Sequence, residues 1–199
     1  MSESNGYSDY QKFLDSKRHT GEKYGFEPTW IPDFLKPFQA FLTDWNIRKG
    51  KSATFADCGL GKSIMEFVVA QNVIEHTNKP ALIACPLAVA HQMVREGEKF
   101  GIKIHKTRDG KVHKGINVTN YQRIHYYNPD DFSIVIYDEA SILKHFEGKM
   151  RKSLTKFIER TLYRLLGAYA RKQGMFSATR ADKISSDIPQ FRHHQYCDQ

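Results

Sequence analysis

Eight consecutive residues, Ala56-Asp57-Cys58-Gly59-Leu60-Gly61-Lys62-Ser63, constrain the fold more than any other part of the sequence. They lie between a short apolar stretch, residues 53–56, and an amphipathic helical pattern that starts at Ile64. A glycine-rich turn between a strand and a helix directs successive backbone N–H groups and the positive end of the helix toward one point, where they can hold phosphate. The segment therefore predicts a phosphate-binding loop in an α/β fold.

The second half of this loop supplies the predicted nucleotide contacts: Gly59, Leu60, Gly61, Lys62 and Ser63. Lys62 is expected to reach the β- and γ-phosphates of a nucleoside triphosphate, and the Ser63 hydroxyl is expected to ligate Mg²⁺. Ala56 replaces the first glycine of the generic pattern. A glycine-rich turn without a nucleotide is the alternative, but the Gly-Lys-Ser ending between a strand and a helix favours the nucleotide.

A pair of adjacent carboxylates, Asp138 and Glu139, follows the apolar run Val135-Ile136-Tyr137. Downstream of a phosphate-binding loop, the first such carboxylate holds Mg²⁺ and the second polarises the attacking water. Alone, an Asp-Glu pair after a strand is usually a solvated turn. Together with Lys62, the pair predicts a catalytic site for ATP hydrolysis made of Lys62, Asp138 and Glu139.

Short apolar runs alternate with helical patterns along most of the chain, which predicts a mainly parallel sheet with helices on both faces. Ligands of such sheets bind at the carboxyl ends of the strands, where both motifs lie. One predicted helix, residues 37–48, carries Phe38, Phe41, Leu42 and Trp45 on one face, which we interpreted as core. The other predicted helices span 62–76 and 88–100, with a helical turn at 121–125, and the predicted strands span 53–56, 81–85, 102–105, 116–119 and 134–137.

Bulk properties are typical of one globular domain with a polyanionic partner. The chain has 199 residues and a net charge of +8, which suits nucleic acid, although many basic proteins bind none. Its three cysteines lack the spacing of a disulfide framework and indicate a reducing compartment. No apolar run has membrane-spanning length, and the N-terminus is not a signal peptide. We expect a cytoplasmic protein.

Taken together, these motifs resemble the first RecA-like lobe of superfamily-two helicases and translocases, of the DEAD/DEAH-like type. The chain looks most similar to phage-type members near the Snf branch, and the A-x-x-G-x-G-K-S form of its loop is a helicase variant of the generic pattern. The resemblance covers roughly residues 10–166 and implies ATP and Mg²⁺ as cofactors. It also implies that Gln39, in Leu35-Lys36-Pro37-Phe38-Gln39, contacts the adenine, since an amide both donates and accepts hydrogen bonds.

The resemblance also implies a nucleic-acid site. Ala84-Cys85-Pro86-Leu87 and Val118-Thr119-Asn120-Tyr121 match the motifs that hold a phosphate backbone without reading its sequence. Pro86, Thr119 and Asn120 are the residues expected to contact it. The alternative is that Pro86 and Asn120 only punctuate and cap the ends of strands. The resemblance favours DNA as the partner, and RNA is not excluded.

The C-terminal residues depart from the family pattern. After Tyr163-Arg164-Leu165-Leu166 the family has a strand ending in Thr-Ala-Thr-Pro, whereas this chain continues Gly167-Ala168-Tyr169. We therefore divide the chain into an N-terminal arm (1–30), an ATP-binding lobe (31–166) and a divergent tail (167–199). A reading-frame slip near residues 167–169 is one explanation of the tail, and ordinary divergence is the other.

These expectations describe the ATP-binding lobe of an ATP-dependent DNA helicase or translocase. Complete motors of this class close a second lobe over ATP, so we expect this chain to be weakly active alone, with a second lobe supplied by another chain. One alternative is a non-catalytic fragment that binds nucleic acid or a partner and retains a vestigial nucleotide site. Another is a different phosphate-loop enzyme such as a kinase, which the Gln39, Thr119-Asn120 and Asp138-Glu139 set does not support.

Overall fold

The computed structural model describes residues 24–56, 59–140, 148–161 and 163–168. All of them belong to one compact unit, Lys23–Gln173. Within these ranges no helix combines the length and the apolar character that crossing a bilayer requires.

A six-stranded sheet forms the centre of this unit, and every pair of neighbouring strands is parallel. Its spatial order is β1-β6-β5-β2-β4-β3, so β3 lies next to β4 and β5 next to β6, whereas two strands separate β1 from β2. The prediction of an α/β fold with a parallel sheet is therefore confirmed. The strands are β1 (Lys51–Phe55), β2 (Ala81–Cys85), β3 (Ile104–Lys106), β4 (Ile116–Asn120), β5 (Ile134–Tyr137) and β6 (Tyr163–Ala168).

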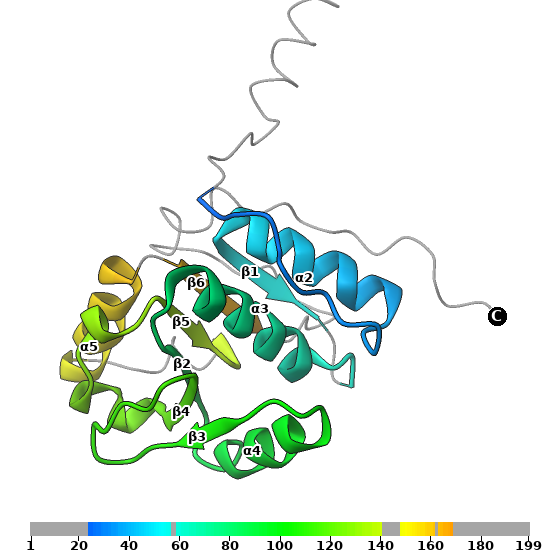
Figure 1. The fold of residues 1–199 in the computed structure, drawn as a ribbon. Helices are drawn as coiled ribbons and strands as arrows, with labels where there is room; N and C mark the ends of the chain where they lie inside the picture. The colour runs from blue at the N-terminus through cyan, green and yellow to red at the C-terminus, as the bar shows by residue number, and fades with distance from the viewer. Residues whose placement is uncertain (1–23, 57–58, 141–147, 162, 169–199) are drawn as a thin grey trace, which may run out of the picture. The chain divides into compact units, whose positions relative to one another are not determined.

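Helices cover both faces of the sheet, as predicted (Figure 1). The first face is covered by α2 (Pro37–Lys49), α3 (Lys62–Thr77) and α4 (Ala90–Lys99), and the second by α5 (Gly148–Arg160) and a 3₁₀ helix, η1 (Tyr121–Tyr126). A second short 3₁₀ helix, η2, spans Pro129–Asp131. The sequence predicted α2, α3 and α4 to within two residues at each end, but it did not predict α5 or η2.

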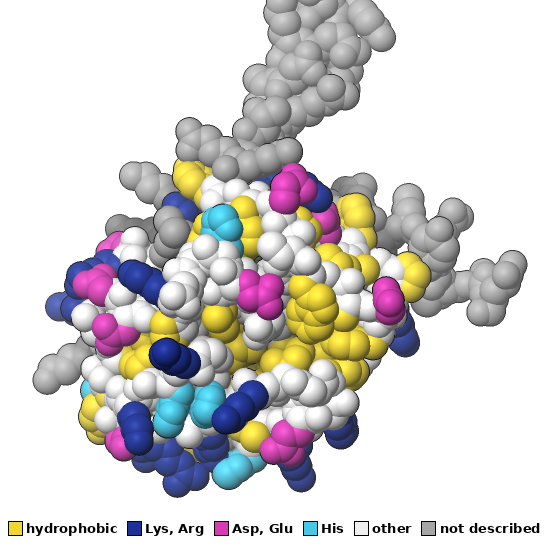
Figure 2. Space-filling view, in the orientation of Figure 1, with side chains coloured by type: hydrophobic (Ala, Val, Ile, Leu, Met, Phe, Trp, Pro, Cys, Tyr) yellow, Lys and Arg dark blue, Asp and Glu magenta, His cyan; other side chains and the backbone are white. Residues whose placement is uncertain are grey.

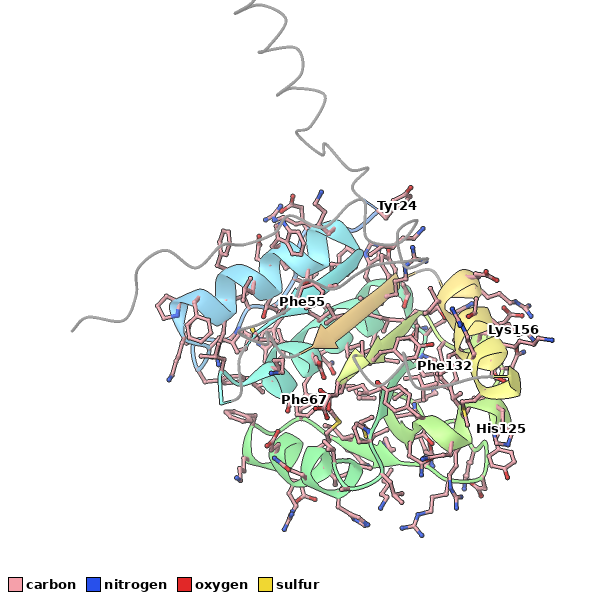
Figure 3. The ribbon with its side chains drawn as sticks, turned by 180° about the vertical axis from the view of Figure 1, so that it is seen from behind. Tyr24, Phe55, Phe67, His125, Phe132 and Lys156 are labelled. Atoms are coloured by element: carbon pink, nitrogen blue, oxygen red, sulfur yellow. The ribbon has the colours of Figure 1, made fainter. Side chains whose placement is uncertain are left out.

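Alternate residues of each central strand enter separate cores. In β2, Ala81, Ile83 and Cys85 pack with α3 and α4, whereas Leu82 and Ala84 pack with α5 and η1. This alternation follows from the two-residue period of a strand, and burial on both faces explains why the strands are apolar throughout. Figure 3 shows the second face, where Phe132 lies between the sheet and α5 while Lys156 points outward.

The aromatic face of α2 is not part of the core, which corrects our interpretation of Phe38 and Phe41. Phe38 is 40% exposed and Phe41 is 60% exposed, and Leu42 and Trp45 are only half-buried. The helix instead buries Gln39, Thr43, Asn46 and Ile47. A polar stripe can face the sheet because β1 offers it partners: Asn46 accepts from Ser52 Oγ at 2.7 Å and donates to Thr54 Oγ1 at 2.9 Å.

The segment before α2, which we assigned in part to an N-terminal arm, contacts the lobe from Tyr24 onward. Tyr24 N and Phe26 N donate to the last turn of α2, and Thr29 and Trp30 bond to the side chain of Asn72 on α3. At the other end, β6 continues to Ala168, two residues past the predicted end of the lobe.

Candidate nucleotide-binding site

The two phosphate motifs lie at the carboxyl ends of β1 and β5, which are separated by one strand, β6. The phosphate-binding loop follows β1 and leads into α3, and Asp138 and Glu139 follow β5. Because all the strands are parallel, both motifs emerge from the same edge of the sheet. The topology therefore brings together two segments that are about 75 residues apart in sequence.

The described part of the loop has the backbone that phosphate binding requires. Gly59 and Gly61 have positive φ angles of 81° and 71°, a region that favours glycine. A Cβ atom on Gly61 would lie 2.5 Å from Gln39 Nε2, so a side chain there would displace the Gln39 amide. Gly61 is also the N-cap of α3, and no side chain caps its first amides, which leaves these donors for an anion. Asp57 and Cys58 lie outside the described residues.

Lys62 and Ser63 occupy the first turn of α3, where the loop motif predicted them. The Lys62 side chain is buried, and its Nζ donates to the carbonyl oxygen of Ala56 at 2.9 Å, which bends the side chain back over the loop. Ser63 is half-buried next to it. The lysine is thus held at the mouth of the loop by a contact that a phosphate oxygen can replace.

Gln39, the predicted adenine contact, packs directly against the loop. Its Nε2 donates to the carbonyl oxygen of Leu60 at 2.9 Å, and its Oε1 accepts from Lys36 N at 2.9 Å. The side chain is buried at the start of α2. These two hydrogen bonds link the start of α2 to the loop.

Asp138 and Glu139 occupy a turn immediately after β5. Burial, reinforced by the neighbouring Glu139, raises the pKa of Asp138 to about 6, and the opposite charge of Lys62 lowers it in part. The backbone of Glu139 has a φ of 60°, an uncommon conformation for a residue other than glycine. The turn is held by Asp138 N, which donates to Ala84 O, and by Tyr121 Oη, which donates to Asp138 O.

The residues around Ser63 and Asp138 fit a magnesium ion. A hydroxyl and a carboxylate are the hard oxygen ligands that Mg²⁺ prefers, and it usually keeps several waters and bridges to phosphate. A bound cation would also favour the charged form of Asp138, whose pKa is raised first by burial and then by the neighbouring Glu139. When bound, the ion would neutralise charge on the phosphates, while Glu139 would orient a water.

Glu66 is a buried carboxylate of the site that sequence reasoning missed. It lies one turn after Lys62 on α3, is 2% exposed, and neither of its carboxylate oxygens has a hydrogen-bond partner among the described residues. Burial and the charge of Asp138 raise its pKa well above the ordinary value, against the opposing effect of Lys62. The available signal was a carboxylate within the otherwise apolar run of residues 64–70.

A cavity of about 10 Å³, close to the space one water occupies, lies beside this carboxylate. Residues from four elements line it: Asn46, Thr54, Lys62, Met65, Glu66 and Leu165. The polar stripe of α2, the edge strand β1 and Lys62 of the loop therefore lie around one cavity. This arrangement explains why the stripe of α2 is polar where an apolar one was predicted.

The three predicted nucleic-acid residues are brought side by side, but they differ in exposure. Thr119 and Asn120 end β4 and pair in register with Ala84 and Cys85, so they adjoin Pro86. Thr119 is 1% exposed and Asn120 is 9% exposed. The Asn120 side chain accepts from Arg123 N at 3.1 Å, which makes it the N-cap of η1. Thr119 Oγ1 is buried with no partner among the described residues.

Comparison with known proteins identifies the fold. No protein-family model matches the chain, and no curated protein matches it significantly. The SWI2/SNF2 ATPase core domain of Sulfolobus solfataricus superposes with a TM-score of 0.61 at 21% identity, over 81% of this chain and 35% of that one. The UvsW helicase of bacteriophage T4 superposes with a TM-score of 0.60 at 14% identity, over 89% of this chain and 63% of that one.

The chain shares its fold with part of the SWI2/SNF2 ATPase core and with part of the UvsW helicase. At the level of the fold, the resemblance to superfamily-two enzymes near the Snf branch, with a phage relative, is confirmed. The same SWI2/SNF2 ATPase core has also been solved in complex with double-stranded DNA, and this chain covers 36% of that chain. The chain thus spans between about one third and two thirds of the length of these structural neighbours.

Proposed function

We propose that this lobe binds Mg-ATP in the phosphate-binding loop and acts as the ATP-binding half of a DNA helicase or translocase. Lys62 binds the β- and γ-phosphates, Ser63 and Asp138 hold Mg²⁺, and Glu139 orients the water. Gln39 contacts the adenine, and the carboxyl ends of β2 and β4 carry the nucleic acid. In this role the lobe binds DNA, as the SWI2/SNF2 ATPase core of Sulfolobus solfataricus does in its complex with double-stranded DNA.

One observation supports this proposal above all. Lys62 and Asp138 come from motifs on different strands, yet they are close enough for the lysine charge to lower the pKa of the carboxyl. A fully solvated Asp-Glu turn would have no reason to be half-buried near a helix N-terminus that begins with a lysine and that no side chain of the described residues caps. The alternative of a glycine-rich turn without a nucleotide does not account for this pairing.

Replacing Lys62 by alanine should weaken Mg-ATP binding by at least about tenfold, because one charge-assisted phosphate contact contributes about 1.5–3 kcal/mol. Isothermal titration calorimetry of the full chain measures the dissociation constant. Lys79→Ala is the matched control, since it removes the same charge from an exposed position just before β2, at the opposite edge of the sheet. Equal ATP affinity of Lys62→Ala and wild type would contradict the proposed site.

A non-catalytic nucleic-acid-binding fragment is the second function that an observation favours. Asn120 serves as a helix cap, and Lys62 is engaged with the Ala56 carbonyl, as each would be in a vestigial site. Such a fragment would bind DNA in a salt-sensitive manner, indifferent to ATP. ATP binding that depends on Lys62 therefore separates the two functions.

We also propose that the 199-residue chain hydrolyses ATP slowly by itself. In the enzymes it resembles, a second lobe adds an arginine finger, a group worth orders of magnitude in rate. We expect a steady-state phosphate release close to that of Glu139→Gln, which serves as the background control, both with and without duplex DNA. A DNA-stimulated turnover that Glu139→Gln abolishes would contradict this expectation and show that the lobe is sufficient.

A further inference from the structure

The surface next to the buried Thr119 and Asn120 is basic. Residues 99–125 contain seven Lys or Arg residues and three histidines, but only one acidic residue, Asp109. Figure 2 shows Lys, Arg and His side chains gathered over the lower part of the molecule, in the region that β3 and α4 occupy in Figure 1. The seven cations are Lys99, Lys103, Lys106, Arg108, Lys111, Lys114 and Arg123.

Four basic groups of this region lie at the carboxyl edge of the sheet. Lys106 is the last residue of β3, Arg108 follows it, Arg123 follows β4 within η1, and His91 is on the first turn of α4 after β2. His91 and Arg108 are exposed, and Lys106 and Arg123 are half-exposed. We call these four residues the β3-edge row.

Contacts among these residues tie the row to the end of β4. Lys106 Nζ contacts His91 Nε2. Arg123 Nη1 donates to the carbonyl oxygen of Arg108 at 2.8 Å, and Arg123 N donates to Asn120 Oδ1. Lys106 also lies close enough to Cys85, at the end of β2, for each to affect the pKa of the other. The Lys106 ammonium is thus directed across β4 toward the strand ends.

The row carries charge that the described part of the protein does not neutralise. The ion pairs found among the described residues join Arg48 to Glu27 and Asp44, and Arg160 to Asp130. None of them includes a member of the row. Burial and the neighbouring Arg108 lower the pKa of Lys106, the direction expected for a cation near another cation. A polyanion laid along this edge would remove that repulsion.

We propose that the β3-edge row binds consecutive phosphates of a nucleic-acid strand that runs along the carboxyl edge from β2 across β4 to β3. The inference rests on the proposed function and changes which residues perform it. Thr119 and Asn120 are buried and shape the edge, whereas His91, Lys106, Arg108 and Arg123 contact the backbone. Contacts of this kind position a strand without reading its sequence, so affinity depends on salt rather than on base order.

The test compares a triple variant with a control of equal charge. Lys106→Ala, Arg108→Ala and Arg123→Ala together remove three charges from the row. Arg151→Ala, Lys152→Ala and Lys156→Ala remove three charges from exposed positions on α5. Fluorescence anisotropy with single-stranded DNA, duplex DNA and RNA of one base sequence, at several salt concentrations, gives the affinity and its salt dependence for each. Thermal melting curves show that both variants are folded.

We expect the row variant to bind nucleic acid at least about tenfold more weakly than the control. The plot of log K against log salt concentration should also become less steep, its negative slope shrinking in magnitude by about two to three. Among single-stranded DNA, duplex DNA and RNA, the one whose salt dependence weakens most is the one that the row contacts. If wild type binds nucleic acid and the row variant keeps the slope of the control, the inference is overturned while the proposed function stands. If wild type binds Mg-ATP but no nucleic acid, the nucleic-acid part of the proposed function fails, and this inference fails with it.

Discussion

Replacing Asn72 by alanine should lower the free energy of unfolding by about 3 kcal/mol, the sum of about 1 kcal/mol for each of three bonds to the backbone of Thr29 and Trp30. Asn72 is fully buried on α3. Its Oδ1 accepts from Thr29 N at 2.9 Å and from Trp30 N at 3.1 Å, and its Nδ2 donates to Trp30 O at 2.8 Å. One side chain therefore fixes the segment before α2 to the helix that carries the phosphate-binding loop.

Chemical denaturation measures this effect as a shift in midpoint at unchanged slope. Gln92→Ala is the control, because it removes an amide of similar size from an exposed position on α4, where its hydrogen bond is to Glu96 within the same helix. We expect the control to change stability by less than about 0.5 kcal/mol. A loss below about 1 kcal/mol for Asn72→Ala would show that residues 29–30 do not depend on it.

Replacing Glu66 by glutamine should stabilise the nucleotide-free protein at pH 8 by about 1–3 kcal/mol, the cost of a buried charged group without a partner. Burial raises the pKa of this carboxyl above its value in the unfolded chain, so the folded state binds the proton more tightly. The stabilising contribution of that proton is complete below the unfolded pKa and is lost as the pH rises through the folded pKa. Wild type should therefore lose stability toward alkaline pH, and the variant should lose less.

Unfolding free energies at pH 5 and pH 8 measure this difference. At pH 5 wild type and Glu66→Gln should be nearly equal, because a protonated carboxyl and an amide are similar in shape and charge. Asp138, whose pKa is raised to about 6, adds a pH dependence of the same sign that remains in the variant. Glu98→Gln, at an exposed position on α4, is the control. Parallel pH profiles for wild type and Glu66→Gln would show that Glu66 is not the titrating group.

The parts of the site that the sequence predicted are those encoded by consecutive residues. The turn of Gly59 and Gly61, the lysine and serine after it, and the carboxylates after β5 each depend on local backbone geometry, which the motif itself specifies. The strands β2, β4 and β5 were predicted to within one residue, because burial on both faces makes them uniformly apolar.

The parts that the sequence did not predict depend on partners from elsewhere in the chain. The aromatic spacing of Phe38 and Phe41 suggested a core face, yet the helix buries Gln39 and Asn46, because β1 and the phosphate-binding loop supply their hydrogen bonds. Periodicity records hydrophobicity along one helix and contains no information on whether a polar residue will find a partner. The same limit applies to Thr119 and Asn120. The sequence motif predicted that they contact a nucleic-acid backbone, but their burial depends on η1 and the neighbouring strands.

By itself, then, the sequence determined that this protein is an α/β lobe with a glycine-rich turn between a strand and a helix and with a carboxylate pair, because those features are local. Only the tertiary structure decided the strand order, in which a single strand, β6, separates β1 from β5 and so sets the spacing of the two motifs along the edge. It also decided that Glu66 is buried beside them and that the β3-edge row is left exposed next to β4. Strand order, burial and the proximity of charged side chains depend on contacts between residues that are distant in sequence. No local pattern specifies such contacts.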